Sequence, residues 1–313
     1  RRLRVRKEED ELKYEFTTDL ARSEPYRRSI QWSHVESLLA TVTENDREAA
    51  STLFQYLLPY QLIEQASNMP DLVLDLDATS AAIPWEILNS ATELSGGREP
   101  LGVRVGLLRT LSTPERRENP RRSRHRRALV VGEPAGVKPA LPGAHQEGEH
   151  VISLLKQHGM EVEQLLEADA DEIFRALYRH EYDIVHIAAH GEFNEPVVDD
   201  ASNSKKQRRS GVVLGEGRYL TSGEFQNLRA VPSVVFLNCC HLARMEQDGR
   251  DKAAPLRNPS RLAASVAEEL IKIGVGVVVA AGWAVGDAAA KAFAESFYRQ
   301  LLRGETVMSA VRV

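Results

Sequence analysis

The second half of the chain alternates short apolar runs with amphipathic stretches. Runs rich in β-branched residues are typical of strands buried on both faces of a parallel sheet. Such strands are predicted at 128–132, 183–188, 233–237 and 275–281, with a shorter strand pair around 212–214 and 219–220. Helices are predicted, from apolar residues at helical spacing, at 143–158, 171–179, 222–228, 262–273 and 287–302. This alternation indicates an α/β fold with a doubly wound, mostly parallel central sheet flanked by helices.

The first part of the chain has a less regular pattern. Residues 1–66 are expected to be mainly helical, because 33–39 and 49–58 carry apolar residues at helical spacing. Strands are expected at 71–77 and 103–111. A stretch with two prolines among many arginines is typical of a linker. The predicted division is a domain over 1–112, a linker over 113–127 and a second domain over 128–313.

Composition and charge narrow the function classes. The chain has 313 residues, of which 42% are hydrophobic, enough for one large or two ordinary domains. Its net charge of −5 gives no global field that favours nucleic acid or an anionic membrane, and no apolar run is long enough to span a bilayer. The chain begins without methionine, so we expect part of a longer protein. Its two cysteines, Cys239 and Cys240, are adjacent, which disfavours a disulfide and suits a reducing cytoplasm.

His190 and Cys240 are the strongest candidates for chemistry. Each stands just past the end of a predicted buried strand, and open α/β sheets place their chemistry at the carboxyl ends of such strands. An imidazole that takes the proton of a thiol creates the nucleophile of a cysteine peptidase. The backbone N–H groups of Gly191 and Cys240 are the candidates for the oxyanion hole. The spacing of 50 residues (240 − 190) matches the caspase arrangement of histidine and cysteine.

The neighbouring residues have structural alternatives. We expect His186 to be a buried, hydrogen-bonded histidine of the core, and Cys239 to point away from Cys240 as a small core residue. A rival interpretation is a zinc site built from His186, His190, Cys239, Cys240 and His241. Adjacent cysteines chelate one ion poorly, so a bound metal is not expected. The thiol and imidazole chemistry implies no organic cofactor either.

The sequence around these residues resembles the CHAT domain, a bacterial relative of caspases and separases. The resemblance rests first on His190-Gly191 and Asn238-Cys239-Cys240. Further blocks extend it over roughly residues 50–313: Leu57-Leu-Pro59, Ile83–Leu88, Leu141–Ala144 with Glu147, Tyr182–His186, Leu220-Thr221, Ala263–Ile273, Gly274–Val285 with Trp283, and Phe297-Tyr298 before Leu301 and Gly304. The order of the blocks is more specific than any one of them.

This resemblance implies a caspase-like α/β sandwich that cleaves a protein substrate, with residues 1–112 as a degenerate, pseudo-caspase half. Asn238, His241 and Trp283 are then candidates for the substrate-pocket wall. Related metacaspases carry an aspartate at the position of Asn238 that helps to bind a basic P1 side chain. The neutral Asn238 therefore favours a small or apolar P1 residue.

The resemblance also implies a setting, a cytoplasmic bacterial protease of antiviral defence or regulated cell death. Its substrate would be a gasdermin-like pore former or another effector. A separate sensor or activator module or chain would switch it on. The alternative is a non-catalytic pseudo-peptidase that scaffolds a signalling complex.

Overall fold

The computed structural model divides the chain into two compact units, of residues 1–114 with 306–313 and of residues 115–305. It describes residues 1–17, 24–41, 47–62, 71–89, 99–113, 115–196, 208–215, 217–240, 259–281 and 285–312. The C-terminal segment thus belongs to the first unit, whereas the sequence analysis assigned it to the second domain.

The first unit contains a five-stranded sheet with the order β3-β2-β1-β4-β5. Strand β1 pairs antiparallel with β2 and parallel with β4, and β4 pairs parallel with β5. The strands are β1 (Arg2–Glu8), β2 (Glu11–Thr17), β3 (Tyr26–Ser29), β4 (Asp71–Leu76) and β5 (Gly106–Leu111).

The N-terminal segment corrects the expectation of a mainly helical region over residues 1–66. Strands occupy most of its first 29 residues, and the helices begin only at Trp32. The reason is a period of two: Leu3 and Val5 are buried and separated by one polar residue, and Leu12 and Tyr14 repeat the pattern. Alternation of this kind favours a strand with one buried face.

The described part of the first unit also contains helices, some of which pack on this sheet. They are α1 (Trp32–Thr41), α2 (Arg47–Leu57), α4 (Ala78–Ala81), α5 (Leu101–Arg104) and α11 (Val307–Val311). The hydroxyl of Tyr14 on β2 donates to the carbonyl oxygen of Leu57 at 2.5 Å and so fastens the end of α2. Helix α11 packs against β5, which explains why the last residues join this unit.

The second unit contains the predicted parallel sheet, in the order β7-β6-β8-β11-β12. Its strands are β6 (Arg127–Gly132), β7 (Glu161–Leu166), β8 (Ile184–Pro196), β11 (Val234–Cys240) and β12 (Val277–Ala280). Strand β9 (Arg208–Gly215) pairs antiparallel with the far end of β8, and β10 (Arg218–Leu220) with β9. The α/β fold with a mostly parallel central sheet is confirmed, and β7 is an edge strand that the sequence analysis missed.

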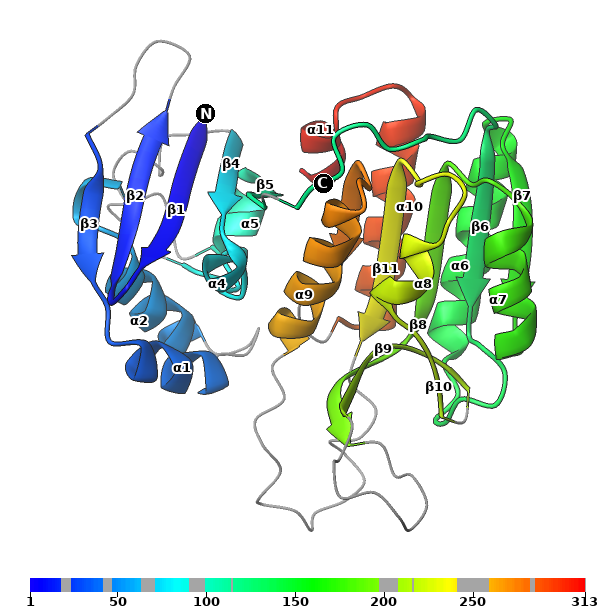
Figure 1. Ribbon diagram of the computed structural model, residues 1–313, viewed down its shortest axis with the longest axis horizontal. Coiled ribbons are helices and arrows are strands. Elements are labelled where there is room, and N and C mark those ends of the chain that lie inside the picture. The colour runs from blue at the N-terminus through cyan, green and yellow to red at the C-terminus, as the bar shows by residue number, and fades with distance from the viewer. Residues whose placement is uncertain are drawn as a thin grey trace. The chain divides into compact units, whose positions relative to one another are not determined.

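Helices cover both faces of this parallel sheet (Figure 1). On one face, Tyr298 and Phe297 of α10 (Asp287–Leu302) contact Phe236 of β11, and α6 (Pro142–Gln157) packs against α10. The other face carries α7 (Ala170–Arg179), α8 (Ser222–Gln226) and α9 (Pro259–Lys272), whose apolar residues share one core with alternate strand residues such as Val185 and Val235. Among the described residues no helix is both long and apolar enough to cross a bilayer.

A buried carboxylate at the end of β4 stabilises the first unit. Asp75 accepts hydrogen bonds from Arg4 at 3.1 Å, Arg6 at 2.7 Å and the hydroxyl of Ser112 at 2.6 Å. Burial alone would raise the pKa of Asp75, but the bonds from Arg6, Ser112 and Arg4 outweigh it, so the pKa is lowered. The ionised form is therefore the one that the fold stabilises.

We predict that Asp75→Asn destabilises the first unit at pH 7, by about 1–3 kcal/mol, because both arginines lose their charged acceptor. A lowered folded-state pKa contributes stability above the unfolded value of about 3.9 that is lost as the pH falls through the folded value. Thermal unfolding should show a difference from wild type that is constant above about pH 5 and shrinks in stronger acid. The exposed Asp10 serves as a control, and an Asp75→Asn deficit that is undiminished at low pH would contradict the account.

Candidate active site

His190 and Cys240 lie where the parallel pairing of two neighbouring strands ends. Strands β8 and β11 pair in a register that sets His190 opposite Cys240, one residue beyond the pair of Ala189 and Cys239. Neighbouring strands lie about 4.8 Å apart, so the two backbones are within reach of a direct side-chain contact. Two residues that are distant in sequence thus meet at one edge of the sheet.

Strand β8 changes its partner at this point. Up to His190 it pairs with β11, and from Gly191 it pairs with β9, where Gly191 stands opposite Val212. His190 is therefore the last β8 residue in the parallel sheet. It is buried, with 8% of its surface exposed. The predicted oxyanion residue Gly191 directly follows it.

The imidazole of His190 is held by the connection between β6 and α6. Its Nε2 atom lies 2.9 Å from the carbonyl oxygen of Pro139. A carbonyl oxygen can only accept, so this contact assigns the proton to Nε2. In the neutral ring the lone pair is then on Nδ1, which is the atom available to act as a base.

Directly beneath this edge lies a buried polar chain. Glu147 of α6 is 1% exposed and accepts a hydrogen bond at Oε2 from the side-chain amide of Asn238, at 2.6 Å. Its other oxygen lies 3.2 Å from Nε2 of the fully buried His186. Nδ1 of His186 lies 3.2 Å from the hydroxyl of Tyr298 on α10. Four polar side chains thus connect β11, α6, β8 and α10 inside the core.

Nε2 of His186 and Oε1 of Glu147 lie 3.2 Å apart without a hydrogen bond between them. Nδ1 of His186 is within hydrogen-bond distance of the hydroxyl of Tyr298, which can donate to it. Burial first, and the charge of Glu147 second, raise the pKa of Tyr298, so its hydroxyl keeps the proton that it donates. We infer that the chain fixes the end of β11, the strand that carries Cys240.

Residues 239 and 238 of β11 lie on opposite faces of the sheet. Cys239 packs against the apolar core that α7 and α9 share, as expected of a small core residue. The expectation that His186 is a buried, hydrogen-bonded core histidine is likewise met by its contact with Tyr298. The amide of Asn238 is directed at Glu147, so a part in binding substrate would have to be shared with that contact.

Two of the predicted pocket residues, His241 and Trp283, lie outside the described residues, as does the side chain of Cys240. The backbone of Cys240 is described and ends β11.

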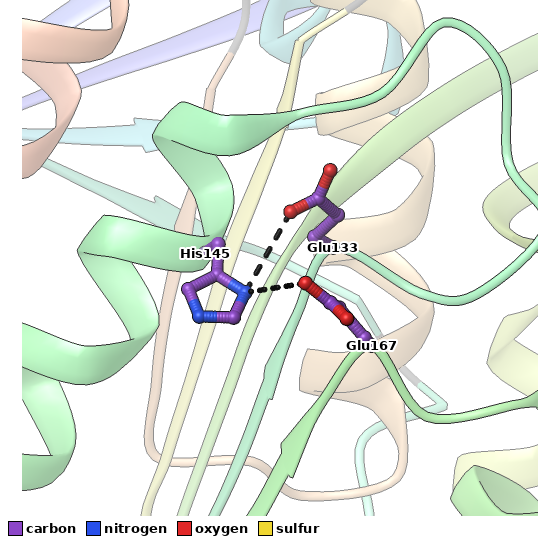
Figure 2. Close-up of side chains that lie close together, drawn as sticks. All are labelled: Glu133, His145 and Glu167. Atoms are coloured by element: carbon purple, nitrogen blue, oxygen red, sulfur yellow. Dashed lines mark ion pairs between the residues drawn. The ribbon is translucent and has the colours of Figure 1, made fainter.

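The rival zinc interpretation involves three residues whose side chains the structure describes: His186, His190 and Cys239. They form no group of three ligand atoms close enough to hold a metal. Among the described residues a different group does so: Glu133, His145 and Glu167 (Figure 2).

Sequence reasoning gave no role to Glu147 and did not select Pro139. Glu147 could have been selected from the sequence, because it stands four residues before Val151 on the apolar side of the predicted helix. A carboxylate is rarely buried at such a position unless it has a partner. Pro139 acts through its carbonyl oxygen, a group that every residue has, so no residue pattern could have identified it.

Comparison with known proteins gives a family model and distantly related structures. The family model of the CHAT domain matches residues 47–313. The crystal structure of the Arg-specific cysteine proteinase gingipain R (RgpB) is 13% identical, with a TM-score of 0.44, and covers 89% of this chain and 69% of that one. A complex of the pro- and mature domains of Porphyromonas gingivalis RgpB gives the same identity, TM-score and coverage of this chain, with 70% of its own. No curated protein matches the chain significantly.

We predict that Asn238→Asp destabilises the protein at neutral pH, by about 3 kcal/mol, because it sets a second, partly buried carboxylate against the buried Glu147. The double variant Glu147→Gln/Asn238→Asp should recover more than half of the loss, since the new amide donates to the new carboxylate. Chemical denaturation of the wild type, both single variants and the double variant measures this coupling. Losses that simply add would show that the contact contributes nothing.

Proposed function

The chain belongs to the CHAT domain family, and we propose that it is a cysteine endopeptidase in which Cys240 is the nucleophile and His190 the base. One observation carries the proposal: the two residues are the last register pair of the parallel strands β8 and β11. The carbonyl of Pro139 supports it, because it leaves Nδ1 of His190 as the basic nitrogen.

The reaction begins with transfer of the Cys240 thiol proton to Nδ1 of His190. The thiolate attacks the carbonyl carbon of the scissile peptide bond and forms a tetrahedral intermediate, whose negative oxygen is stabilised by the N–H groups of Gly191 and Cys240. When the intermediate collapses, the C–N bond breaks and His190 gives its proton to the leaving amine. The product is a thioester on Cys240.

A water molecule completes the cycle. His190 takes a proton from this water as it attacks the thioester carbonyl, and then returns it to the departing thiolate. The contact with Pro139 keeps the imidazole in one tautomer and orientation through both steps, as the third member of a catalytic triad does. The reaction needs neither a redox step nor a bound group beyond substrate and water.

The proposed substrate is a protein cut at a selected site, such as a gasdermin-like pore former or another effector of bacterial defence in the cytoplasm. A sensor or activator, in this protein or another chain, would control the activity. Substrates can be sought by incubating wild-type and Cys240→Ala protein with the proteins encoded beside it and comparing the fragments.

We predict that a thiol-directed peptide electrophile labels Cys240 much faster than Cys239, because the partly buried Cys239 packs against the core on the opposite face of the sheet. His190→Ala should slow the labelling by about 10²–10⁴-fold, the usual contribution of a positioned base. Mass spectrometry of the labelled peptide identifies the residue, and Cys239→Ala serves as the matched control. Labelling of neither cysteine in the presence of the activating proteins would overturn the proposal and favour a pseudo-peptidase scaffold.

We further predict cleavage after small or apolar P1 residues. Asn238 is neutral, and its amide already donates to Glu147, so it offers no negative charge to a basic side chain. A peptide library with a varied P1 position, read out by mass spectrometry, tests this. Cleavage chiefly after arginine or lysine would refute the assignment.

A further inference from the structure

Three side chains of metal-ligand type converge next to the β6–α6 connection (Figure 2). Glu133 directly follows β6, Glu167 directly follows β7, and His145 lies in the first turn of α6. Nδ1 of His145 is 3.6 Å from Oε2 of Glu133 and 3.4 Å from Oε1 of Glu167. The three ligand atoms all lie within 4.8 Å of one another.

These distances do not fit hydrogen bonds. A charge-assisted N–H···O bond measures about 2.7–2.9 Å, and both contacts are longer. Nδ1 of His145 is itself buried and makes no hydrogen bond, a costly state for a polar atom directed at two carboxylates. No described group of the protein therefore forms a hydrogen bond with Nδ1 of His145.

The same distances fit a shared metal ion. With bonds of about 2.1 Å to nitrogen and oxygen, the ligands of a tetrahedral ion are about 3.4 Å apart. The two distances from His145 lie at or near this value. An ion between the three atoms would satisfy Nδ1 and offset the charge of both carboxylates.

We propose that Glu133, His145 and Glu167 form a binding site for a divalent first-row transition metal ion, for which Zn²⁺ is the probe. Imidazole nitrogen suits such ions, whereas Ca²⁺ and Mg²⁺ prefer ligands that are all oxygen. Three protein ligands leave at least one coordination position to water. Glu133 and His145 are largely buried, with side chains 18% and 29% exposed, and Glu167 closes the site from the solvent side at 67%.

The site is connected to the candidate active site by a short path. The second oxygen of Glu133 accepts a hydrogen bond from the backbone N–H of Leu141 at 2.8 Å. Between these two residues lies Pro139, whose carbonyl oxygen contacts His190. A bound ion would hold Glu133, and through it the segment that orients His190. This regulatory consequence rests on the proposed function, whereas binding of the ion does not.

The test is calorimetric titration of Zn²⁺ into the full chain carrying Cys240→Ala. This background removes the reactive thiol, so the result does not depend on peptidase activity. We expect one ion per chain. Glu167→Gln and His145→Gln should each weaken binding by at least about tenfold, the lower bound for disturbing groups around a metal. Ca²⁺ should not compete.

Glu149→Gln is the matched control. It removes one carboxylate from the same helix, near the other ring nitrogen of His145 at 3.7 Å. Because Glu149 is 60% exposed and outside the ligand group, its loss should weaken binding by less than about fivefold. Circular dichroism confirms that each variant folds. If His145→Gln does not fold, Glu167→Gln decides, since its side chain is mostly exposed.

Two results would overturn the site. One is a lack of Zn²⁺ binding by the chain that keeps Glu133, His145 and Glu167. The other is binding that Glu167→Gln and Glu149→Gln change equally. A Co²⁺ spectrum adds a check, because thiolate charge-transfer bands would assign the ion to Cys239 instead.

Discussion

The parallel pairing of β8 with β11 is the constraint on which the candidate site depends. Its register sets His190 opposite Cys240, and a shift by one residue would turn one of them to the other face. Apolar residues on both faces of the sheet, such as Val235 on one face and Phe236 on the other, are buried and therefore enforce this register. The geometry of the chemistry follows from the packing of the core.

The connection from β6 into α6 brings the other elements of the site together. Within a short stretch it supplies the carbonyl of Pro139 to His190, the carboxylate of Glu147 to Asn238 and His186, and His145 to the proposed metal site. His190 is thus held by the segment that leads into α6, and the strand that carries Cys240 is held by α6 itself, so a change in this region would reach both.

The sequence predicted the parts of the fold whose signal is local. Helix α10 was predicted over the residues that it occupies, because its apolar spacing is regular over 16 residues. Strand β7 was missed, since an edge strand with Glu161, Glu163 and Gln164 lacks a buried apolar run. The N-terminal hairpin was assigned to helix although its alternation was visible. His190 was predicted just past the end of a strand over 183–188, but β8 runs on to Pro196, and only its pairing with β11 ends at His190. The contact between Asn238 and Glu147 spans 91 residues and has no local signal.

The central claim is that a thiol and an imidazole share one edge of the sheet. The most direct measurement is the distance between Sγ of Cys240 and Nδ1 of His190 in a crystal structure with a substrate-like peptide bound. The account predicts about 3–4 Å, within or near hydrogen-bond reach. Side chains that stay far apart on opposite faces of the sheet with the peptide in place would contradict it.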